Sequence, residues 1–517
     1  ISDDRRADEV QKARRVGLLP RGSGERKPPR FMSDRRRVIV DIRAYGGYNI
    51  IVPNGTMENA ATRRSARCAM TDGTVSWGTE KISKILLKLA PPVMLAQLIQ
   101  ALYNIVDSLF VGMYSESGLT ALSIVYPLQL LMIALAVGTG VGINTVVAAR
   151  LGVGDKKGAD ECAGVAAPLA TALWLAFALA CYFLMPLYAD VSTDSETVAA
   201  DVIVYGRIVC VFSFGLFEES VWTKVMQANG NMKTPMIAQI AGAVVNIALD
   251  PLLIFGPLFF PEAGIAGAAI ATVAGQVVAA LVVMRGGIRR PPPVRTVPRY
   301  VASVFRMGLP NILMQSAYTL YIFGLNLILA TFSDQAVTAL GLYYKWQTFF
   351  FIPLGAMQTC IVPVISYNYA AHDLARCRST VRESMLFGLV LMAVGTLCFL
   401  AIPAQMLGVF TRDPEVIRIG TVGFRYIGVS FLPMVASLLF PVFFQAVGAG
   451  VQSSLLTVIR TVVLFVPLGY LFSRAGLDLF WRAYPVTEFI TAGAGAVMYF
   501  LFFKKHRASD PPAPRDA

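Results

Sequence analysis

Histidine and charged side chains are scarce in this sequence. It contains 2 histidines among 517 residues, and Asp, Glu, Lys and Arg make up 15% of the chain, whereas a soluble domain carries about 25% charged residues. His372 and His506 both fall in predicted loop or tail segments. This scarcity argues against a histidine metal site and against a catalytic centre built on histidine.

Three further signatures are missing. The seven cysteines form no C-x-x-C pair, so we interpret them as small buried hydrophobic residues without a disulfide framework or a zinc site. No G-x-x-x-x-G-K-[ST] motif is present, which argues against ATP hydrolysis by this chain. The N-terminal segment contains no apolar stretch of the secretory type.

The first 79 residues differ in composition from the rest. They are rich in Arg, Asp, Ser and Gly, and we expect residues 1–79 to be a disordered, basic extension because they cannot build an apolar core. The chain begins with Ile, and Met32, Met57 and Met70 are candidate start positions. Our hypothesis is that translation begins at Met70. The alternative is a genuine basic tail in the cytoplasm.

Long apolar runs dominate the remaining sequence. Hydrophobic residues make up 56% of the chain, and the mean hydropathy is +0.60. About twelve runs are long enough to cross a bilayer as helices. We therefore predict an all-α integral membrane protein with about twelve transmembrane helices.

The charged residues separate by loop. The net charge is +13, and the basic residues gather in alternate loops, for example 285–299, with Lys224 and Lys233 counted near another such loop. Acidic residues such as Asp190, Glu262 and Asp334 occupy the intervening loops. By the positive-inside rule we expect a cell-membrane protein with both termini in the cytoplasm, and no nucleic-acid partner is needed to explain the charge.

The two halves of the apolar region repeat at a constant offset. Identical residues stand 218 positions apart in several spans, including Pro92 and Pro310, Gln97 and Gln315, Tyr103 and Tyr321, and Gln227 and Gln445. We predict two pseudo-symmetric six-helix lobes, an N-lobe at 80–285 and a C-lobe at 300–505, joined by a cytoplasmic linker at 286–299 and followed by a tail at 506–517. Parallel repeats of this kind are a transporter architecture with the substrate site between the halves.

Two acids lie inside apolar runs of the first half, Asp107 and Asp250. An acid at membrane depth indicates a functional site, because an uncompensated charge in hydrocarbon is unfavourable by several kcal/mol. Other polar residues share a helical face with these acids or line a neighbouring span: Gln97, Gln100 and Asn104 before Asp107; Gln239 and Asn246 before Asp250; and Thr272 with Gln276 in the sixth span. Such oxygens suit Na⁺, and a desolvated carboxyl group suits H⁺.

The alternative is that these polar groups only bond neighbouring helices. The repeat favours a function for the acids, because the positions equivalent to Asp107 and Asp250 are Leu325 and Leu468. Charged residues elsewhere at membrane depth are weaker candidates for a central cavity. These are Glu218, Glu219, Lys345 and Glu488, as well as Arg460, and the alternative for each is pairing between helices or snorkelling.

Four tracts together resemble the multidrug and toxic compound extrusion (MATE) transporters: LYNIVDSLFVG (102–112), MQANGNMKTP (226–235), NIALDPLLIFG (246–256) and GIAGAAIATV (264–273). The resemblance covers about residues 80–505 and implies a V-shaped cavity between two lobes. It also implies an N-lobe cation site at Asp107, Asn246, Asp250 and Thr272. The family branch with acids on the seventh and tenth helices is not matched, because Gln315 and Asn326 are the polar residues of the seventh span. In the fourth span, Glu218-Glu219 stands where the resemblance implies amides.

The resulting expectation is a secondary active antiporter, not an enzyme, that exchanges Na⁺ or H⁺ for organic and often cationic compounds. It would need no cofactor beyond the coupling ion, would have a small-molecule substrate and the bilayer as its partners, and would be monomeric. A flippase for a lipid-linked saccharide is the alternative transporter, for which a strongly cationic cavity is expected. An integral-membrane enzyme is less favoured because histidines are missing from the spans, and a non-transporting receptor or scaffold leaves the one-sided acids unexplained.

Overall fold

The computed structural model describes residues 76–193, 195–256 and 262–507. Within these ranges the chain is helical and contains no strand. Twelve helical segments of this part are long and apolar enough to cross a membrane. The predicted all-α, multi-pass membrane architecture is confirmed.

The spans fall into two consecutive sets of six. The first set is α3 (Ile82–Tyr114), α4 (Glu116–Gly152), α5 (Lys156–Ser192), α6 (Glu196–Val211) with α7 (Phe214–Ala228), α8 (Lys233–Ile254) and α9 (Gly264–Gly287). The second is α10 (Val297–Ala330), α11 (Asp334–Ala370), α12 (Leu374–Ala401), α14 (Pro414–Ala446), α15 (Gly450–Val458) with η4 (Ile459–Phe465) and α16 (Val466–Ser473), and α18 (Ala483–Arg507). Short turns η2 (Ser76–Gly78), η3 (Val294–Thr296), α13 (Pro403–Gly408) and α17 (Leu477–Phe480) connect or precede them.

Helix caps repeat between the halves. The Ser115 side chain accepts a hydrogen bond from the Gly118 amide at 3.2 Å, and Ser333, 218 positions later, accepts one from the Ala336 amide at 3.2 Å. Asp155 and Asp373 show the same spacing, and each accepts from the amide three residues on. Such caps satisfy amides that the first helical turn leaves unpaired. The two halves therefore start equivalent helices with the same local chemistry.

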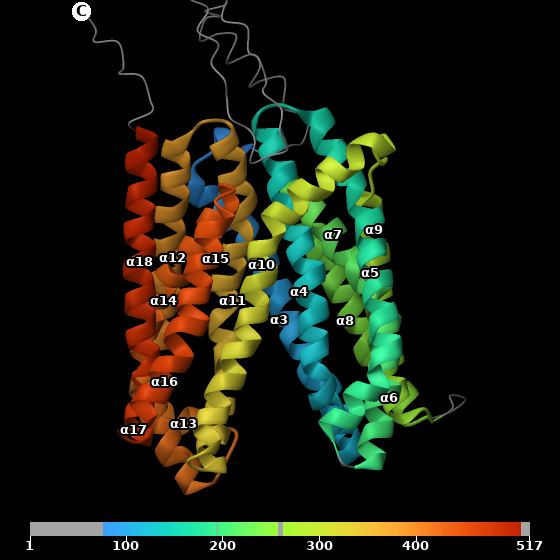
Figure 1. Cartoon of the computed structure of the whole chain (residues 1–517), viewed down its shortest axis with the longest axis vertical. Helices are drawn as coiled ribbons and strands as arrows, with labels where there is room; N and C mark the ends of the chain where they lie inside the picture. Colours follow the sequence, from blue (N-terminus) through green and yellow to red (C-terminus); the bar gives the residue numbers. More distant parts are fainter. Residues whose placement is uncertain (1–75, 194, 257–261, 508–517) are drawn as a thin grey trace, which may run out of the picture.

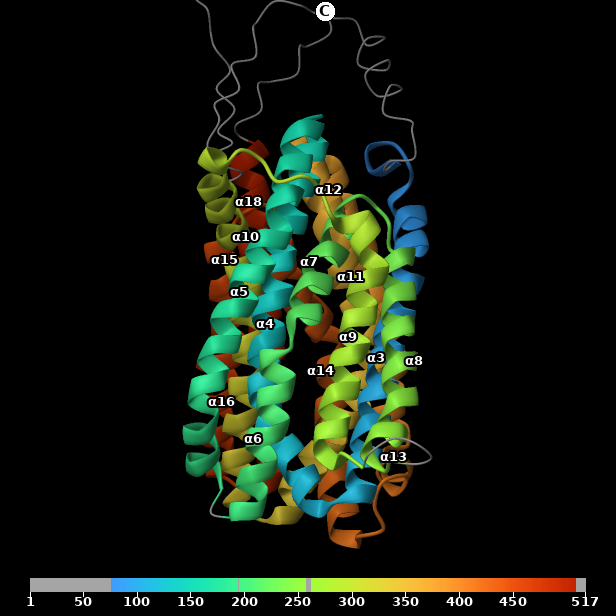
Figure 2. The ribbon, with the colours of Figure 1, turned by 90° about the vertical axis from the view of Figure 1, so that its right-hand side faces the viewer.

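Figure 1 shows the two sets of spans as neighbouring bundles, with the start of α3 and the end of α18 at the same end of the molecule, and Figure 2 agrees. The bundles exchange contacts through their first helices. Helix α3 packs against both α8 and α11, and α10 packs against α4. Glycines permit the second contact, because a Cβ at Gly142 would overlap the backbone of α10 at Val304 and Gly308.

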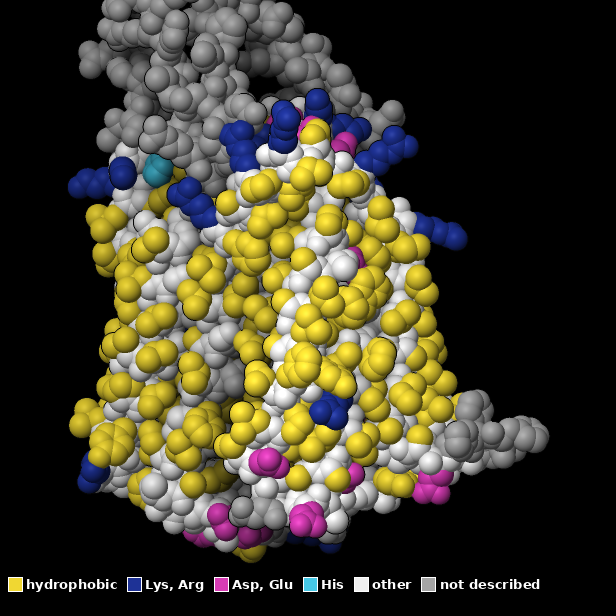
Figure 3. Space-filling view, turned by 45° about the vertical axis from the view of Figure 1, so that its right-hand side comes forward, with side chains coloured by type: hydrophobic (Ala, Val, Ile, Leu, Met, Phe, Trp, Pro, Cys, Tyr) yellow, Lys and Arg dark blue, Asp and Glu magenta, His cyan; other side chains and the backbone are white. Residues whose placement is uncertain are grey.

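The molecular surface is banded. Figure 3 shows a broad apolar belt, with Lys and Arg gathered at the end that carries the termini and Asp and Glu gathered at the opposite end. At the basic end the bundles are joined by specific contacts. The Tyr300 hydroxyl donates to Glu161 Oε2 at 2.9 Å, and Arg376 Nε donates to the Trp77 carbonyl oxygen at 2.9 Å.

The expected segment boundaries need small corrections. Most of the extension expected at 1–79 lies outside the described residues, but its last four residues are ordered: Ser76–Gly78 form η2, and Trp77 is buried with its ring 5.9 Å from that of Tyr367. The linker is shorter than 286–299, because α9 continues to Gly287 and α10 begins at Val297. Pro298 sits in the first turn of α10, where its missing amide is tolerated. At the other end, α18 continues to Arg507, two residues into the expected tail.

Candidate functional site

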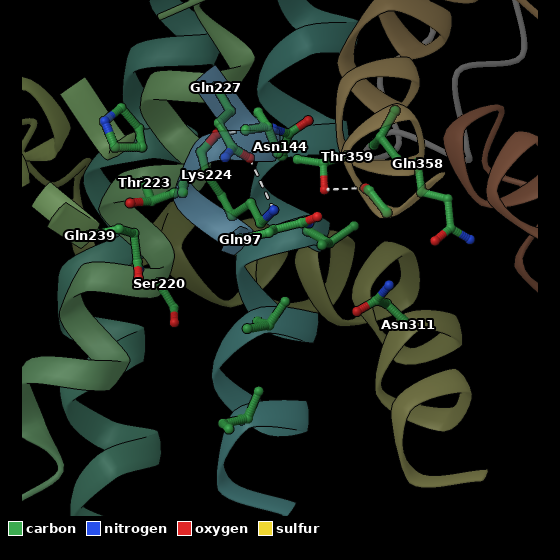
Figure 4. A pocket seen from close by; sticks show the side chains of 18 of the residues that line it. Gln97, Asn144, Ser220, Thr223, Lys224, Gln227, Gln239, Asn311, Gln358 and Thr359 are labelled. Carbon is green, nitrogen blue, oxygen red and sulfur yellow. Dashed lines mark hydrogen bonds between the residues drawn. The ribbon is translucent and has the colours of Figure 1, made fainter. Parts of the chain in front are cut away.

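A central cavity of about 430 Å³ lies between the two bundles. Both halves contribute polar side chains to its wall, and Figure 4 shows several of them directed toward a common space. The polar residues are Gln97, Gln100, Asn144, Glu219, Ser220, Thr223, Lys224, Gln227 and Gln239 from the first half, and Asn311, Gln315, Gln358, Thr359 and Gln445 from the second. An amide-rich wall of this kind can hydrogen-bond many different small molecules.

One acid and one base are the charged residues that the described part of the chain places in this wall. Glu219 is 6% exposed and accepts hydrogen bonds from Thr223 Oγ1 at 2.8 Å and from Gln239 Nε2 at 3.0 Å. Lys224, one turn further along α7, donates from Nζ to Gln227 Oε1 at 3.0 Å. The two charges are held by separate amide partners, so the cavity offers both a negative and a positive group to a ligand.

A smaller chamber of about 60 Å³ opens from the central cavity into the N-lobe. The two spaces share Gln100, Leu216, Glu219 and Gln239 in their walls. Helices α3, α7, α8 and α9 form this chamber, and Tyr103, Asn246, Thr272 and Gln276 complete its polar wall. Glu219 therefore stands where the central cavity meets the N-lobe chamber.

Of the four residues expected to bind a cation, Asn246 and Thr272 line this chamber and Asp250 lies beside Asn246. Asn246 Nδ2 lies 3.4 Å from Asp250 Oδ1 and 3.5 Å from Thr272 Oγ1. Asp250 is fully buried. The structure thus places Asn246, Asp250 and Thr272 next to one another on α8 and α9, and α3, which carries Asp107, packs against α8.

Three oxygens of this group are buried without a hydrogen-bond donor among the described residues: Asp107 Oδ1, Asn246 Oδ1 and Asp250 Oδ2. Buried polar atoms are rarely left unpaired in folded proteins. Because all three atoms are acceptors, a cation or a proton would satisfy them, whereas an anion would not. The described residues contain no cluster of three His, Cys, Asp or Glu side chains, so the donor set is mixed carboxylate, amide and hydroxyl oxygen, which suits a hard monovalent ion better than a transition metal.

The remaining predicted residues divide between the two spaces and other places. Gln97, Gln100, Gln239 and Gln315 line the central cavity, Gln276 lines the N-lobe chamber, and Glu219 lines both. Asn104 is exposed on α3 and lines neither space, although it lies about one turn beyond Gln100 on the same face of the helix.

Three charged candidates do not line the central cavity. Glu218 points toward α5, where its carboxylate accepts a hydrogen bond from Thr171 Oγ1 at 2.6 Å. Consecutive helical residues point about 100° apart, so Glu218 and Glu219 face different neighbours. Lys345 is exposed and lies over the ring of Phe410 at 5.2 Å. Glu488 is fully buried and is paired with Arg460 at 2.6 Å.

From the sequence we counted Lys224 among the basic residues near a loop, but in the structure it lines the central cavity. Its signal was the spacing to Glu219 and Gln227, which places it on the same half of α7. Gln227 and Gln445 were recognised only as a repeat, and both line the cavity from equivalent places in the two lobes. A repeated polar residue inside an apolar span was thus a better indicator of the cavity than a single charge.

Comparison with known proteins agrees with this architecture. The MatE family model matches residues 92–252 and 310–471, one copy in each half. This chain belongs to the MatE family. Its members are transporters, so the enzyme alternative is excluded.

Relatives of this MatE protein include multidrug export protein MepA of Staphylococcus aureus strain MRSA252, 24% identical over 437 residues that cover 81% of this chain and 94% of the relative. The FAD transporter of Shewanella oneidensis is 24% identical over 439 residues with the same coverage. Among solved structures, an outward-facing MATE-family multidrug resistance transporter superposes with a TM-score of 0.77 at 23% identity, covering 85% of this chain and 98% of that one. A MOP superfamily transporter from Pyrococcus furiosus also gives 0.77, at 22% identity and with 83% and 98% coverage.

Proposed function

We propose that this protein exports organic compounds in exchange for Na⁺ or H⁺ by alternating access. The observation that carries the proposal is the group of donor-free buried oxygens on Asp107, Asn246 and Asp250, beside a chamber that opens into the central cavity. Relatives named as a multidrug export protein and as a FAD transporter support transport of large organic cargo.

The geometry suggests how ion and cargo influence each other. A cation bound by Asp107 and Asp250 removes the repulsion between two carboxylates and draws α3 toward α8. Because α3 also packs against α11 of the other lobe, a shift of α3 changes the contact between lobes. Coupling then follows if ion and cargo favour different arrangements of the two lobes.

The charge distribution supports an orientation. The positive-inside rule places the basic end, seen in Figure 3, in the cytoplasm, and with it both termini. The contacts that join the lobes at this end are then cytoplasmic. This is the arrangement of an outward-facing transporter. The cell membrane is the proposed location. The central cavity has a single lysine in its described wall, which does not favour the flippase alternative and its strongly cationic cavity.

The test is export of a fluorescent organic cation from proteoliposomes, with the Na⁺ gradient and the pH gradient imposed separately. We expect the wild-type protein to respond to one of them, and Asp107→Asn and Asp250→Asn to abolish gradient-driven export, because an intramembrane acid is by default a functional group. Glu218→Gln is the matched control, because it removes a buried acid that lines neither cavity.

Elution as a single species and an unchanged unfolding temperature establish that each variant is folded. Gradient-driven export that persists in the folded Asp107→Asn/Asp250→Asn double variant would remove the proposed mechanism.

A further inference from the structure

The C-lobe has a chamber of its own, of about 250 Å³, which shares Met314, Gln315, Gly355 and Gln358 with the wall of the central cavity. Gln358 is visible at the second-half side of the space in Figure 4. No residue of the expected cation site belongs to this chamber. A molecule in the central cavity can therefore reach into it from the side opposite the N-lobe chamber.

The two chambers occupy equivalent places in the repeat. Five positions that line the N-lobe chamber have partners 218 residues later that line the C-lobe chamber: Gln100 and Tyr318, Glu219 and Ser437, Gln239 and Thr457, Gly242 and Arg460, and Ala243 and Thr461. The acid of the first chamber is replaced by a hydroxyl, and a glycine of the first is replaced by an arginine. The same architectural site thus carries opposite charge in the two lobes.

Arg460 is held firmly at the wall. Its Nε and Nη2 donate to Glu488 Oε1 at 3.0 and 2.6 Å, and Ser437 donates to the other carboxylate oxygen. Glu488 is fully buried and does not line the chamber, whereas Arg460 does. The carboxylate therefore lies behind the guanidinium, and the chamber faces the positive end of the pair.

Two N–H donors remain for a ligand. Within the described residues Arg460 Nη1 has no acceptor, and it is not among the fully buried atoms. The Gln347 side chain accepts from the Tyr318 hydroxyl at 3.3 Å through Oε1, which leaves its Nε2 hydrogens free. Arg460 also lies within the π-helical turn η4, and such turns occur frequently at functional sites.

We propose that the C-lobe chamber binds the carboxylate, or a comparable anionic group, of a transported compound whose apolar body rests in the central cavity. Arg460 and Gln347 donate to the acidic group, and Phe351 and Leu354, which line the same chamber, contact the part of the molecule next to that group. This assignment rests on the proposed transport function and specifies one substrate class for it: zwitterions and organic anions with an aromatic body.

A matched pair of dyes tests the assignment. Rhodamine 110 carries a free carboxylate, and rhodamine 123 is its methyl ester, so the two differ only in the acidic group. Binding of each to the purified full chain in detergent is measured by fluorescence polarisation, without any ion gradient. We expect wild-type protein to bind the acid about tenfold more tightly than the ester, as a charge-assisted hydrogen bond provides.

The decisive variant is Arg460→Gln with Glu488→Gln, which removes the guanidinium without leaving a lone buried charge. It should bind both dyes equally, with the affinity for the ester unchanged. Gln347→Leu should lower the preference for the acid severalfold without touching the ion pair. Lys345→Gln is the control, because it removes an exposed positive charge that lines neither cavity.

Equal binding of the two dyes to wild-type protein would overturn the assignment, and so would an undiminished preference in a folded Arg460 or Gln347 variant. If the double variant does not fold, the assignment is still tested by the preference of the wild-type protein for rhodamine 110 and by the change in that preference in Gln347→Leu. Failure of the proposed antiport appears separately, as loss of gradient dependence in proteoliposomes while the dye preference persists.

Discussion

The N-lobe and C-lobe chambers are two versions of one site, and their differences follow from a few residues. In the N-lobe, Gly242 and Gly275 bring α8 against α9 so closely that a Cβ on either would lie 2.7 Å from the carbonyl oxygen of the other. In the C-lobe, the equivalents are Arg460 and Gly493, and a Cβ on Gly493 would meet nothing within 4 Å. The close glycine contact leaves about 60 Å³ in the first chamber, against about 250 Å³ in the second.

The comparison also fits the different tasks that we propose for the two lobes. The small N-lobe chamber is lined by Glu219 and lies beside the donor-free oxygens of Asp107, Asn246 and Asp250, a set that suits a small cation. The larger C-lobe chamber presents guanidinium and amide hydrogens, which suit part of an organic molecule. Pseudo-symmetric scaffolds can therefore separate ion binding from cargo binding through substitutions at equivalent positions.

The largest expected effect is the loss of stability when the ion pair of Arg460 and Glu488 in the C-lobe is broken. Glu488→Gln leaves Arg460 charged, largely buried and without its carboxylate partner, and breaking a buried pair in this way destabilises a protein by about 3–5 kcal/mol. We expect a marked fall in the thermal unfolding temperature of the purified protein, with a smaller fall for the neutral Arg460→Gln/Glu488→Gln variant. Glu415→Gln, which breaks an exposed pair with Arg418, should change little. A stable Glu488→Gln protein would show that water reaches Arg460.

The second effect, on stability and on the ion dependence of export, comes from the contact between Gly242 and Gly275. Gly275→Ala forces α9 away from α8, because its Cβ would lie 2.7 Å from the Gly242 carbonyl oxygen and 3.1 Å from Asn246 Cβ. Overpacking of this kind destabilises by about 1–3 kcal/mol, and it should also weaken the ion dependence of export by displacing Asn246. Gly493→Ala is the equivalent change in the open C-lobe position. Equal unfolding temperatures and ion dependence for the two variants would contradict the packing explanation.

Sequence alone predicted the repeat and the spans, and it singled out Asp107 and Asp250, because these depend on helical period and on the cost of burying charge. The cation site at Asp107, Asn246, Asp250 and Thr272 stays a prediction. Glu218 and Glu219 show the limit. They are adjacent and chemically identical, and only the position of α5 decides that the first pairs with Thr171 while the second lines the cavity. Arg460 and Glu488 are 28 residues apart, and no local sequence pattern indicates that they pair or that Arg460 separates Glu488 from the chamber.

The smallest expected effect is a change in dye affinity, and it tests the contrast in charge between the two lobes. Glu219→Gln removes the acid of the central cavity while keeping a side chain of similar size that can still accept from Thr223 and Gln239. We expect binding of the cationic ester rhodamine 123 to weaken about tenfold, or ~1.4 kcal/mol, while Glu218→Gln has no effect because that acid faces α5. Rhodamine 110 carries the same cationic ring system, so its binding should weaken by a similar factor, and the preference for the acid over the ester should stay unchanged because the contact of the acid with Arg460 is untouched. An unchanged ester affinity would place the cationic part of the cargo away from Glu219 and would remove the N-lobe from cargo recognition.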